Sequence, residues 1–272
     1  ARTVEDAVKV LQVIAGYDPN DPITKLSEGK VPKDYTKFLV KDGLKGARIA
    51  VFTRYIETKT IDPQIKKLFL QAVDDLRKQG ATIITPFDIP NYDSLIADIW
   101  QPVFQYDLNK YLASLGDKAP YKTLRGIYDS GLYLPYVKET MEDELKYTTP
   151  PQDRNPPVLD LYHTEKNIKF RDAVINEMNK FKVDAIVYPT WSNQPRLVGD
   201  TTSPDGDNSQ ILSPQTGMPA ITVPIGYTKE GLPAGMTFFG KLFDEPTLIK
   251  FAYSYEQATK HRKAPKNFPA IK

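Results

Sequence analysis

Histidine, the side chain that most often acts as a general base, is scarce in this sequence. A serine-histidine-acid site needs a nucleophile, a base and an orienting carboxylate. The 272 residues contain two histidines, His163 and His261, and no cysteine. Neither histidine follows a predicted strand, and no Gly-x-Ser-x-Gly elbow is present. The sequence therefore indicates no histidine-based triad and excludes a cysteine nucleophile, a disulfide and a thiolate metal site.

A polar segment at residues 199–210, GDTTSPDGDNSQ, also carries groups that could bind a ligand. Its run from Asp205 to Asn208 offers oxygen ligands, but the glycine and the closing glutamate are misplaced for an EF-hand. A turn stabilised by Asx side chains explains the same residues. No P-loop or Gly-x-Gly-x-x-Gly motif occurs. We therefore expect neither a bound metal nor a cofactor.

The elements that must position these residues follow an alternating pattern. Strands are predicted at residues 47–52, 82–85 and 184–188, and helices at 4–15, 63–79, about 160–181 and from 244 onward. The first two strands enclose an amphipathic helix, which predicts a parallel βαβ unit. Ligands bind at the carboxyl ends of strands in open α/β sheets. The strand exits after Phe52, Thr85 and Tyr188 are therefore the expected place for a site.

A hairpin is predicted within TGMPAITVPIGYTKEGLPAGMTFFG, residues 216–240, because two apolar runs flank a Lys-Glu-Gly turn. Each run contains a proline, Pro224 or Pro233, and proline within a sheet is confined to edges and bulges. We expect these prolines to end the pairing and turn the strands. The alternative is an edge hairpin whose prolines block aggregation.

Length and composition fit one α/β domain over residues 1–272, with a mixed sheet and a variable helical and loop excursion at 93–158. Apolar residues make up 40% and charged residues 26% of the chain, and the net charge is +2. This balance gives no electrostatic case for nucleic acid or for an anionic membrane. No run approaches 18 apolar residues, so no membrane span is predicted. Composition leaves the cellular compartment unknown.

Three segments form a long shared pattern. They are ARTVEDAVKVLQVIAGYDPNDP at 1–22, VDAIVYPTWSNQP at 183–195 and SPQTGMPAITVPIGYTKEGLPAGMTFFGKLFDEPTLIKFAYSYEQAT at 213–259. In this order they resemble the amidase-signature hydrolases. PTWSNQPR and SPDGDNSQ are similar to the peptide-amidase-like branch. The resemblance implies an α/β/α layered fold, of which this chain would be the C-terminal half.

The resemblance also implies which groups perform the reaction. The family acts through a serine nucleophile, a second serine in a cis peptide and a lysine base, all of which precede the part matched by residues 1–22. A serine hydroxyl is weakly nucleophilic until a base removes its proton. A lysine is such a base once burial lowers its pKa. No Gly-Gly-Ser-Ser run is present, so no catalytic residue is assigned here, and enzyme activity of this chain alone stays open.

The reaction implied is hydrolysis of a carboxamide or peptide-terminal amide to acid and ammonia through an acyl-serine intermediate. We expect the substrate-binding residues to be Trp191, Asn193, Asp207, Asn208 and Gln215. Trp191 could equally be a core aromatic residue, and the polar side chains taken singly could stabilise the loop. Two alternative functions are the amidase subunit of a tRNA-dependent amidotransferase, and a non-catalytic binding or scaffold module derived from an amidase.

The expected partners follow from the same resemblance. They are a small-molecule amide or short peptide amide, the missing N-terminal half of the amidase, and a second copy of the chain in a homo-oligomer. Half of a mixed sheet would expose an apolar edge and face. We therefore expect this chain to associate with the missing half or with itself.

Overall fold

The computed structural model describes residues 1–265, which form two compact units. The first unit combines residues 1–92 with the chain from residue 170 onward, and the second comprises residues 93–169. The predicted excursion at 93–158 lies inside the second unit. That the whole chain is one domain stays a prediction. Within residues 1–265 no helix has both the length and the apolar character needed to cross a membrane.

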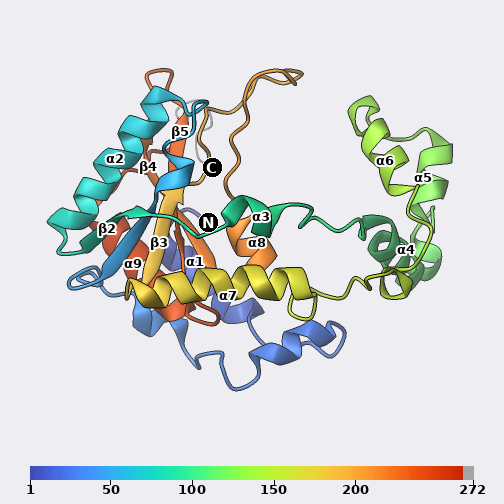
Figure 1. Cartoon of the computed structure of the whole chain (residues 1–272), viewed down its shortest axis with the longest axis horizontal. Coiled ribbons are helices and arrows are strands. Elements are labelled where there is room, and N and C mark those ends of the chain that lie inside the picture. The colour runs from blue at the N-terminus through green and yellow to red at the C-terminus, as the bar shows by residue number, and fades with distance from the viewer. Residues whose placement is uncertain (266–272) are drawn as a thin grey trace, which may run out of the picture. The chain divides into compact units, whose positions relative to one another are not determined.

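Helices and strands are interspersed along the chain (Figure 1). The strands are β1 (Arg48–Phe52), β2 (Thr82–Phe87), β3 (Ala185–Pro189), β4 (Ala220–Tyr227) and β5 (Pro233–Phe239). The helices are α1 (Val4–Ile14), α2 (Pro63–Lys78), α3 (Tyr92–Ile96), α4 (Phe104–Ser114), α5 (Leu124–Ser130), α6 (Lys138–Glu144), α7 (Glu165–Lys180), α8 (Leu212–Thr216) and α9 (Glu245–Thr259). Short 3₁₀ turns lie at Pro22–Ser27, Tyr35–Phe38, Thr53–Tyr55, Gly116–Lys118, Pro135–Val137 and Pro151–Asp153.

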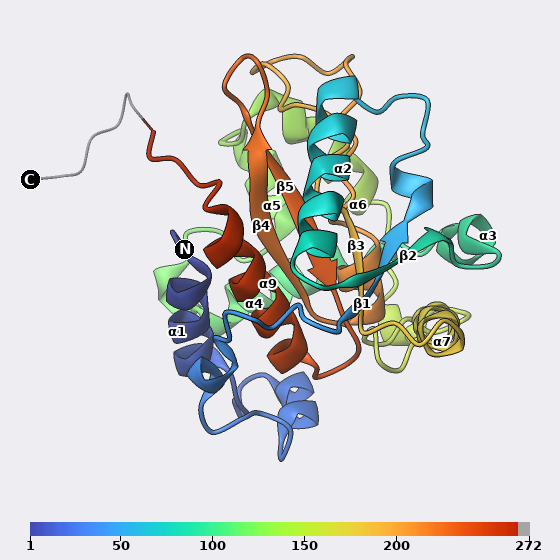
Figure 2. The same cartoon turned by 90° about the vertical axis from the view of Figure 1, so that its left-hand side faces the viewer.

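The five strands form a mixed sheet in the order β2-β1-β3-β5-β4 (Figure 2). β1 is parallel to both β2 and β3, whereas β5 is antiparallel to both β3 and β4. The predicted α/β class, the mixed sheet and the parallel βαβ unit are therefore confirmed. The hairpin that follows the polar loop extends the sheet beyond β3. The last residue of β3, Pro189, therefore pairs with Met236 of β5.

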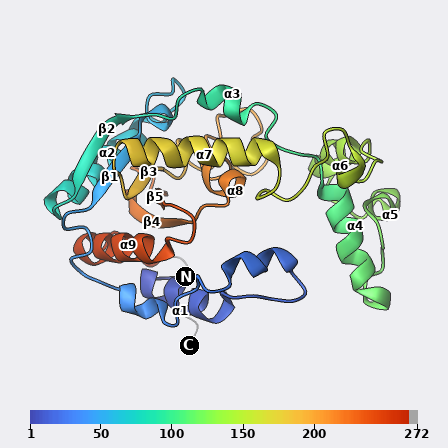
Figure 3. The same cartoon turned by 60° about the horizontal axis from the view of Figure 1, so that its bottom comes forward.

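Both faces of the central strands are covered. On one face Val51, Val187 and Met236 pack in a cluster with α2 and α9. On the other face the Phe52 ring meets the Tyr92 ring, which in turn meets the Phe170 ring of α7. Figure 3 shows α7 and α9 on opposite sides of the strands. Because both faces are buried, β1 and β3 read as continuous apolar runs rather than alternating ones.

Local signals fix the starts of two helices in the first unit. The Thr3 hydroxyl accepts a hydrogen bond from Asp6 N at 3.0 Å and caps α1. The Asp62 carboxylate accepts from Gln64 N at 2.6 Å and caps α2. These caps satisfy amide groups that a helix leaves unpaired at its start. These caps therefore begin the two helices at the starts predicted from the sequence, residues 4 and 63.

The two hairpin prolines lie differently from the first expectation. Pro233 is the first residue of β5, and Pro224 pairs with Gly235 inside β4. The ladder shifts register after Pro224 but continues to Tyr227, so Pro224 does not end the pairing. β4 is the outermost strand on its side of the described sheet. A missing N–H is tolerated at such an edge irregularity, which agrees with the alternative expectation of an edge hairpin.

Candidate substrate pocket

The segment that leaves β3 returns to it, so that residues 190–208 form a closed loop. Asn208 N donates to Thr190 O at 3.0 Å, and Ser192 N donates to Gly206 O at 2.8 Å. Trp191 and Asp207 form an isolated antiparallel bridge between these bonds. The two ends of the loop are thus paired like a short ribbon. This pairing holds Trp191 at the carboxyl end of β3.

Side-chain hydrogen bonds attach this loop to the rest of the first unit. The Asn208 amide donates to Pro189 O and to Ser192 Oγ, both at 2.8 Å. Gln194 donates to the Asp62 carboxylate at 2.9 Å and accepts from the Thr228 hydroxyl at 3.0 Å. The loop is therefore bound at once to β3, to the N-terminus of α2 and to the hairpin turn.

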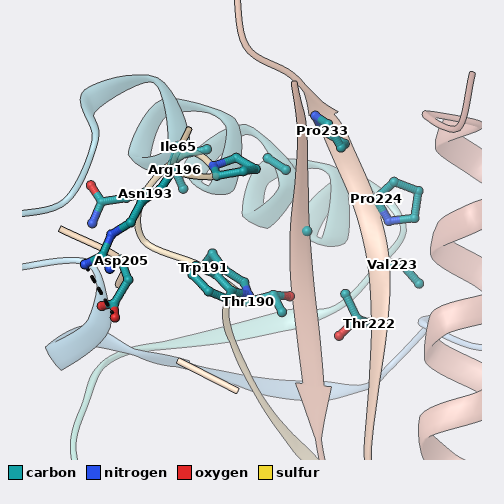
Figure 4. Close-up of a pocket in the computed structure, with 13 residues that line it drawn as sticks. Ile65, Thr190, Trp191, Asn193, Arg196, Asp205, Thr222, Val223, Pro224 and Pro233 are labelled. Carbon is teal, nitrogen blue, oxygen red and sulfur yellow. Dashed lines mark ion pairs between the residues drawn. The ribbon is translucent and has the colours of Figure 1, made fainter. Parts of the chain in front are cut away.

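A cavity of about 600 Å³ lies between this loop, the first turn of α2 and the β4–β5 hairpin (Figure 4). Its apolar lining is Ile65, Trp191, Pro195, Val223, Pro224, Pro233 and Ala234, and its other lining residues are Thr190, Asn193, Arg196, Asp205, Thr222 and Gly235. The Trp191 side chain is 41% exposed and presents an aromatic face there. Ligand sites are usually apolar hollows with a few polar groups, so this cavity can hold an apolar group beside a polar one.

One ion pair lies at the surface of the cavity. Arg196 Nη2 is 3.6 Å from Asp205 Oδ2, and the Asp205 side chain is 61% exposed (Figure 4). An exposed pair of this kind contributes little to stability. Among the described residues, no group of three or more His, Cys, Asp or Glu side chains is placed to hold a metal ion. The chemistry that the lining offers is hydrogen bonding and apolar contact.

Substituting Gly206 by alanine should loosen the loop. Gly206 has φ +63°, and an added Cβ would lie 2.6 Å from Asn193 Nδ2. We expect Gly206→Ala to lower the free energy of unfolding by about 1–3 kcal/mol, measured by urea denaturation. Gly199→Ala is the matched control, because Gly199 has φ +90° but open space around its Cβ position. Equal losses in both variants would mean that the Asn193 contact contributes nothing.

Tyr55, Tyr92 and Tyr188 form a largely buried cluster next to the end of β3. The Tyr55 and Tyr92 hydroxyls are 2.5 Å apart, and the Tyr188 ring meets the Tyr55 ring edge-on at 5.5 Å. Burial raises the pKa of Tyr55 to about 12 and raises the pKa of Tyr92 and of Tyr188 further. These phenols therefore stay protonated at neutral pH and act as rigid apolar support for the exit of β3.

The five residues expected to bind substrate divide into two groups. Trp191 and Asn193 line the cavity, whereas Asp207, Asn208 and Gln215 are not among its lining residues. Asp207 accepts hydrogen bonds from Ser209 and Gln210. Asn208 is 8% exposed and fixes the loop, and Gln215 is 8% exposed within α8. A direct substrate contact by any of the five stays a prediction.

Several lining residues were missed by the sequence analysis, above all Thr190 and Thr222. Thr222 and Thr237 lie opposite each other on β4 and β5. The sequence does carry one signal for them. Small polar residues that occupy one face of an otherwise apolar hairpin mark a polar stripe. That stripe was visible in the alternation of ITVPIG and AGMTFF.

Comparison with known proteins identifies the family. The model of the family described as Amidase matches residues 1–249, which include every residue of the cavity. The chain belongs to the amidase family. A probable amidase of Arabidopsis thaliana is 31% identical over 285 residues, covering 97% of this chain and 48% of that protein. A glutamyl-tRNA(Gln) amidotransferase subunit of Oceanobacillus iheyensis is 30% identical, covering 96% of this chain and 54% of that protein.

Solved structures of amidases share the fold. The peptide amidase of Stenotrophomonas maltophilia superimposes with a TM-score of 0.74 at 28% identity, covering 97% of this chain and 53% of that enzyme. An amidase family protein of Bacillus anthracis gives a TM-score of 0.72 at 28% identity, covering 98% of this chain and 49% of that protein. The resemblance to amidase-signature hydrolases, and to peptide amidases among them, is thus confirmed. The chain spans about half the length of the amidase relatives it matches.

Proposed function

We propose that this chain supplies the substrate pocket of an enzyme that hydrolyses a carboxamide or a peptide-terminal amide to an acid and ammonia. The observation that supports it most is the cavity at the exit of β3, which lies wholly inside the region matched by the amidase family. Its apolar lining and its threonine hydroxyls suit an amide that carries an apolar side chain. Trp191 and Asn193 are the proposed substrate contacts, and Asp207, Asn208 and Gln215 complete the proposed set as supporting residues.

The reaction itself would depend on groups that this chain does not contain. The family's serine nucleophile attacks the amide carbonyl, a neutral lysine takes the hydroxyl proton, and ammonia leaves as the acyl-serine forms. Water then releases the acid from the serine. No residue of this chain is assigned to these steps, because no Gly-Gly-Ser-Ser run is present. The chain's own contribution is to bind and orient the amide.

A segment with the family's serine-rich signature is therefore the proposed partner. The outer edge of β4 is unpaired within residues 1–265, and α1 exposes Val10, Val13 and Ile14, each more than half accessible. An open strand edge and exposed apolar side chains each favour association. Homo-oligomer formation through the same surface is the competing expectation. Analytical ultracentrifugation distinguishes a monomer from either assembly.

Two measurements on the same purified material test the proposed function. Intact-mass analysis under denaturing conditions shows every polypeptide that is present, and an ammonia-release assay on an amino-acid amide measures hydrolysis. We expect hydrolysis only where a heavier parent or a second chain accompanies the species of 30.8 kDa. Hydrolysis by the 30.8 kDa species alone, or none in material that carries the serine-rich segment, would contradict the proposal.

A second function is favoured by the amidotransferase relative. A subunit of such an enzyme would use glutamine as its amide and would deliver ammonia to a partner. The same ammonia assay with glutamine, compared with a peptide amide, separates the two functions. Preference for glutamine would favour the amidotransferase, and preference for the peptide amide would favour the hydrolase. If neither amide is hydrolysed by material with the serine-rich segment, the non-catalytic binding module is the remaining alternative.

A further inference from the structure

Three threonine hydroxyls form a continuous chain across the sheet at the cavity. Thr190 Oγ1 is 2.8 Å from Thr237 Oγ1, which is 3.0 Å from Thr222 Oγ1. Thr190 follows β3, Thr237 lies in β5 and Thr222 lies in β4. The row of hydroxyls therefore crosses three neighbouring segments of the sheet. Thr190 and Thr222 line the cavity, whereas Thr237 is 3% exposed. The two threonine hydroxyls that line the cavity are therefore the two ends of one hydrogen-bonded unit.

Counting protons shows what this unit offers to a ligand. Three hydroxyls carry three protons, and the two contacts between them use two. Within the described chain these hydroxyls have no other hydrogen-bond partner. If Thr237 accepted from both neighbours, its own buried proton would lack an acceptor, which is costly. The hydrogen bonds between the three hydroxyls therefore all point in one direction. The hydroxyl at one end donates into the cavity, and the hydroxyl at the other end offers lone pairs.

A carboxamide matches this pair of ends. Its carbonyl oxygen accepts a hydrogen bond and its N–H group donates one, from adjacent atoms. The two chain ends are less than about 6 Å apart, since each is in hydrogen-bond contact with Thr237. A carboxylate has acceptors only, so it satisfies the donating end and places its second oxygen against lone pairs. The same geometry therefore binds the amide better than the acid.

Gly235 keeps the space between the two ends open. A Cβ at residue 235 would lie 3.0 Å from Thr190 Oγ1 and 3.0 Å from Thr222 Cγ2. Any larger residue would therefore crowd the Thr190 hydroxyl and the Thr222 methyl group. Trp191 lies beside the same end and lines the same cavity (Figure 4). A ligand can thus reach both hydroxyls while its apolar group contacts the indole.

We propose that Thr190, Thr237 and Thr222 are the polar recognition element of this pocket, which binds a carboxamide and discriminates against the corresponding carboxylate. This inference rests on the proposed function, because it concerns the same pocket. Beyond the proposed function, the inference states that the preference for the amide substrate over the acid product arises in this chain, which supplies the pocket. An acid that binds weakly leaves the pocket readily, so product would not compete strongly with substrate.

Trp191 provides the reporter for a binding test. The protein has two tryptophans, Trp100 and Trp191. In a Trp100→Phe variant, all tryptophan fluorescence therefore comes from Trp191. The probes are N-acetyl-L-phenylalaninamide and N-acetyl-L-phenylalanine, titrated into the 272-residue chain at neutral pH. Both carry the same apolar group and differ only in amide against carboxylate. We expect saturable binding of the amide and a weaker Kd for the acid.

Isosteric variants then test the hydroxyls. Thr222→Val and Thr190→Val should each raise the Kd of the amide by about 5–20-fold. The variant that removes the accepting end should raise the Kd of the acid by less than about twofold, because the carboxylate binds the donating end only. Thr222→Ser keeps the hydroxyl and should retain most of the amide binding. Gly235→Ala should weaken amide binding by filling the gap. Thr82→Val, an exposed threonine in β2, is the matched control and should change neither Kd.

The outcomes separate this inference from the proposed function. Unchanged amide binding in the valine variants, or equal loss for amide and acid in both of them, would overturn the inference, as would absence of amide binding in the Trp100→Phe chain. The proposed function is judged by ammonia release instead. A normal preference for the amide without any hydrolysis by material carrying the serine-rich segment would contradict the proposed function and leave the recognition element intact.

Discussion

Between pH 10 and pH 12 the folded chain should lose stability steeply and unfold cooperatively. Tyr92, Tyr188 and Tyr255 in the first unit are buried, and Tyr55 is partly buried against Tyr92 and Tyr188. Burial disfavours the phenolate and raises the pKa of each of them, to about 12 for Tyr55. In the unfolded chain the same phenols ionise near pH 10. The unfolded state therefore releases protons in a range where the folded state keeps them.

The sign and size of the effect follow from proton linkage. A pKa raised by folding contributes stability that is complete below the unfolded pKa and is lost as the pH rises toward the folded pKa. Each phenol that stays protonated lowers the free energy of unfolding by about 1.4 kcal/mol per pH unit above pH 10. Four such groups together give roughly 5–6 kcal/mol per pH unit, which exhausts the stability of an ordinary domain within two units.

Urea denaturation from pH 8 to pH 11.5, with tyrosinate absorbance followed in parallel, checks this result. Tyr188→Phe is the informative variant, because the Tyr188 hydroxyl has no hydrogen-bond partner among residues 1–265. Its loss should cost little at pH 8 and should make the alkaline slope shallower by about 1.4 kcal/mol per pH unit. Tyr136→Phe, at a residue 77% exposed, is the control and should leave the slope unchanged. A flat profile, or ionisation of every tyrosine near pH 10 without unfolding, would contradict the argument.

Much of the sheet could be predicted because its signals are local. The apolar face of α2, the cap at Asp62 and the short apolar runs at 48–52 and 185–189 each depend on neighbouring residues. Pro224 shows the limit of such reasoning. A proline in a strand indicates an edge or a bulge, but only the observed register shows that pairing continues past it. The order of strands is a non-local property, and no local pattern contains it.

Only part of the site could be predicted, from the rule that ligands bind at the carboxyl ends of strands in open α/β sheets. That rule placed attention on the residues after Tyr188, and Trp191 and Asn193 do line the cavity. The threonine chain needed the register of three segments, since Thr190 and Thr222 are 32 residues apart in sequence and meet through Thr237. Asn208 was expected at the site from its polarity. Its burial and its two acceptors, which decide its role, are set by the loop folding back on itself.

Asn208→Ala should be the most damaging single change in the loop. The Asn208 amide satisfies Pro189 O and Ser192 Oγ in a buried position, and alanine would leave both without their donor. A buried polar group that loses its partner costs about 1–3 kcal/mol, so we expect a loss of about 2–4 kcal/mol in the free energy of unfolding. The closed loop would also open, so binding of N-acetyl-L-phenylalaninamide should weaken together with stability.

Trp191→Ala is the matched contrast, because it removes a residue of the same loop that lines the cavity and is 41% exposed. We expect it to lower the free energy of unfolding by about 1–2 kcal/mol, less than Asn208→Ala does, because it leaves no buried polar group without a partner. Amide binding, measured by calorimetry, should fall at least as far as in Asn208→Ala, because the aromatic contact is gone. Loss of binding in Asn208→Ala with unchanged stability would show instead that Asn208 contacts the ligand directly. The two variants therefore distinguish a residue that shapes the pocket from one that binds within it.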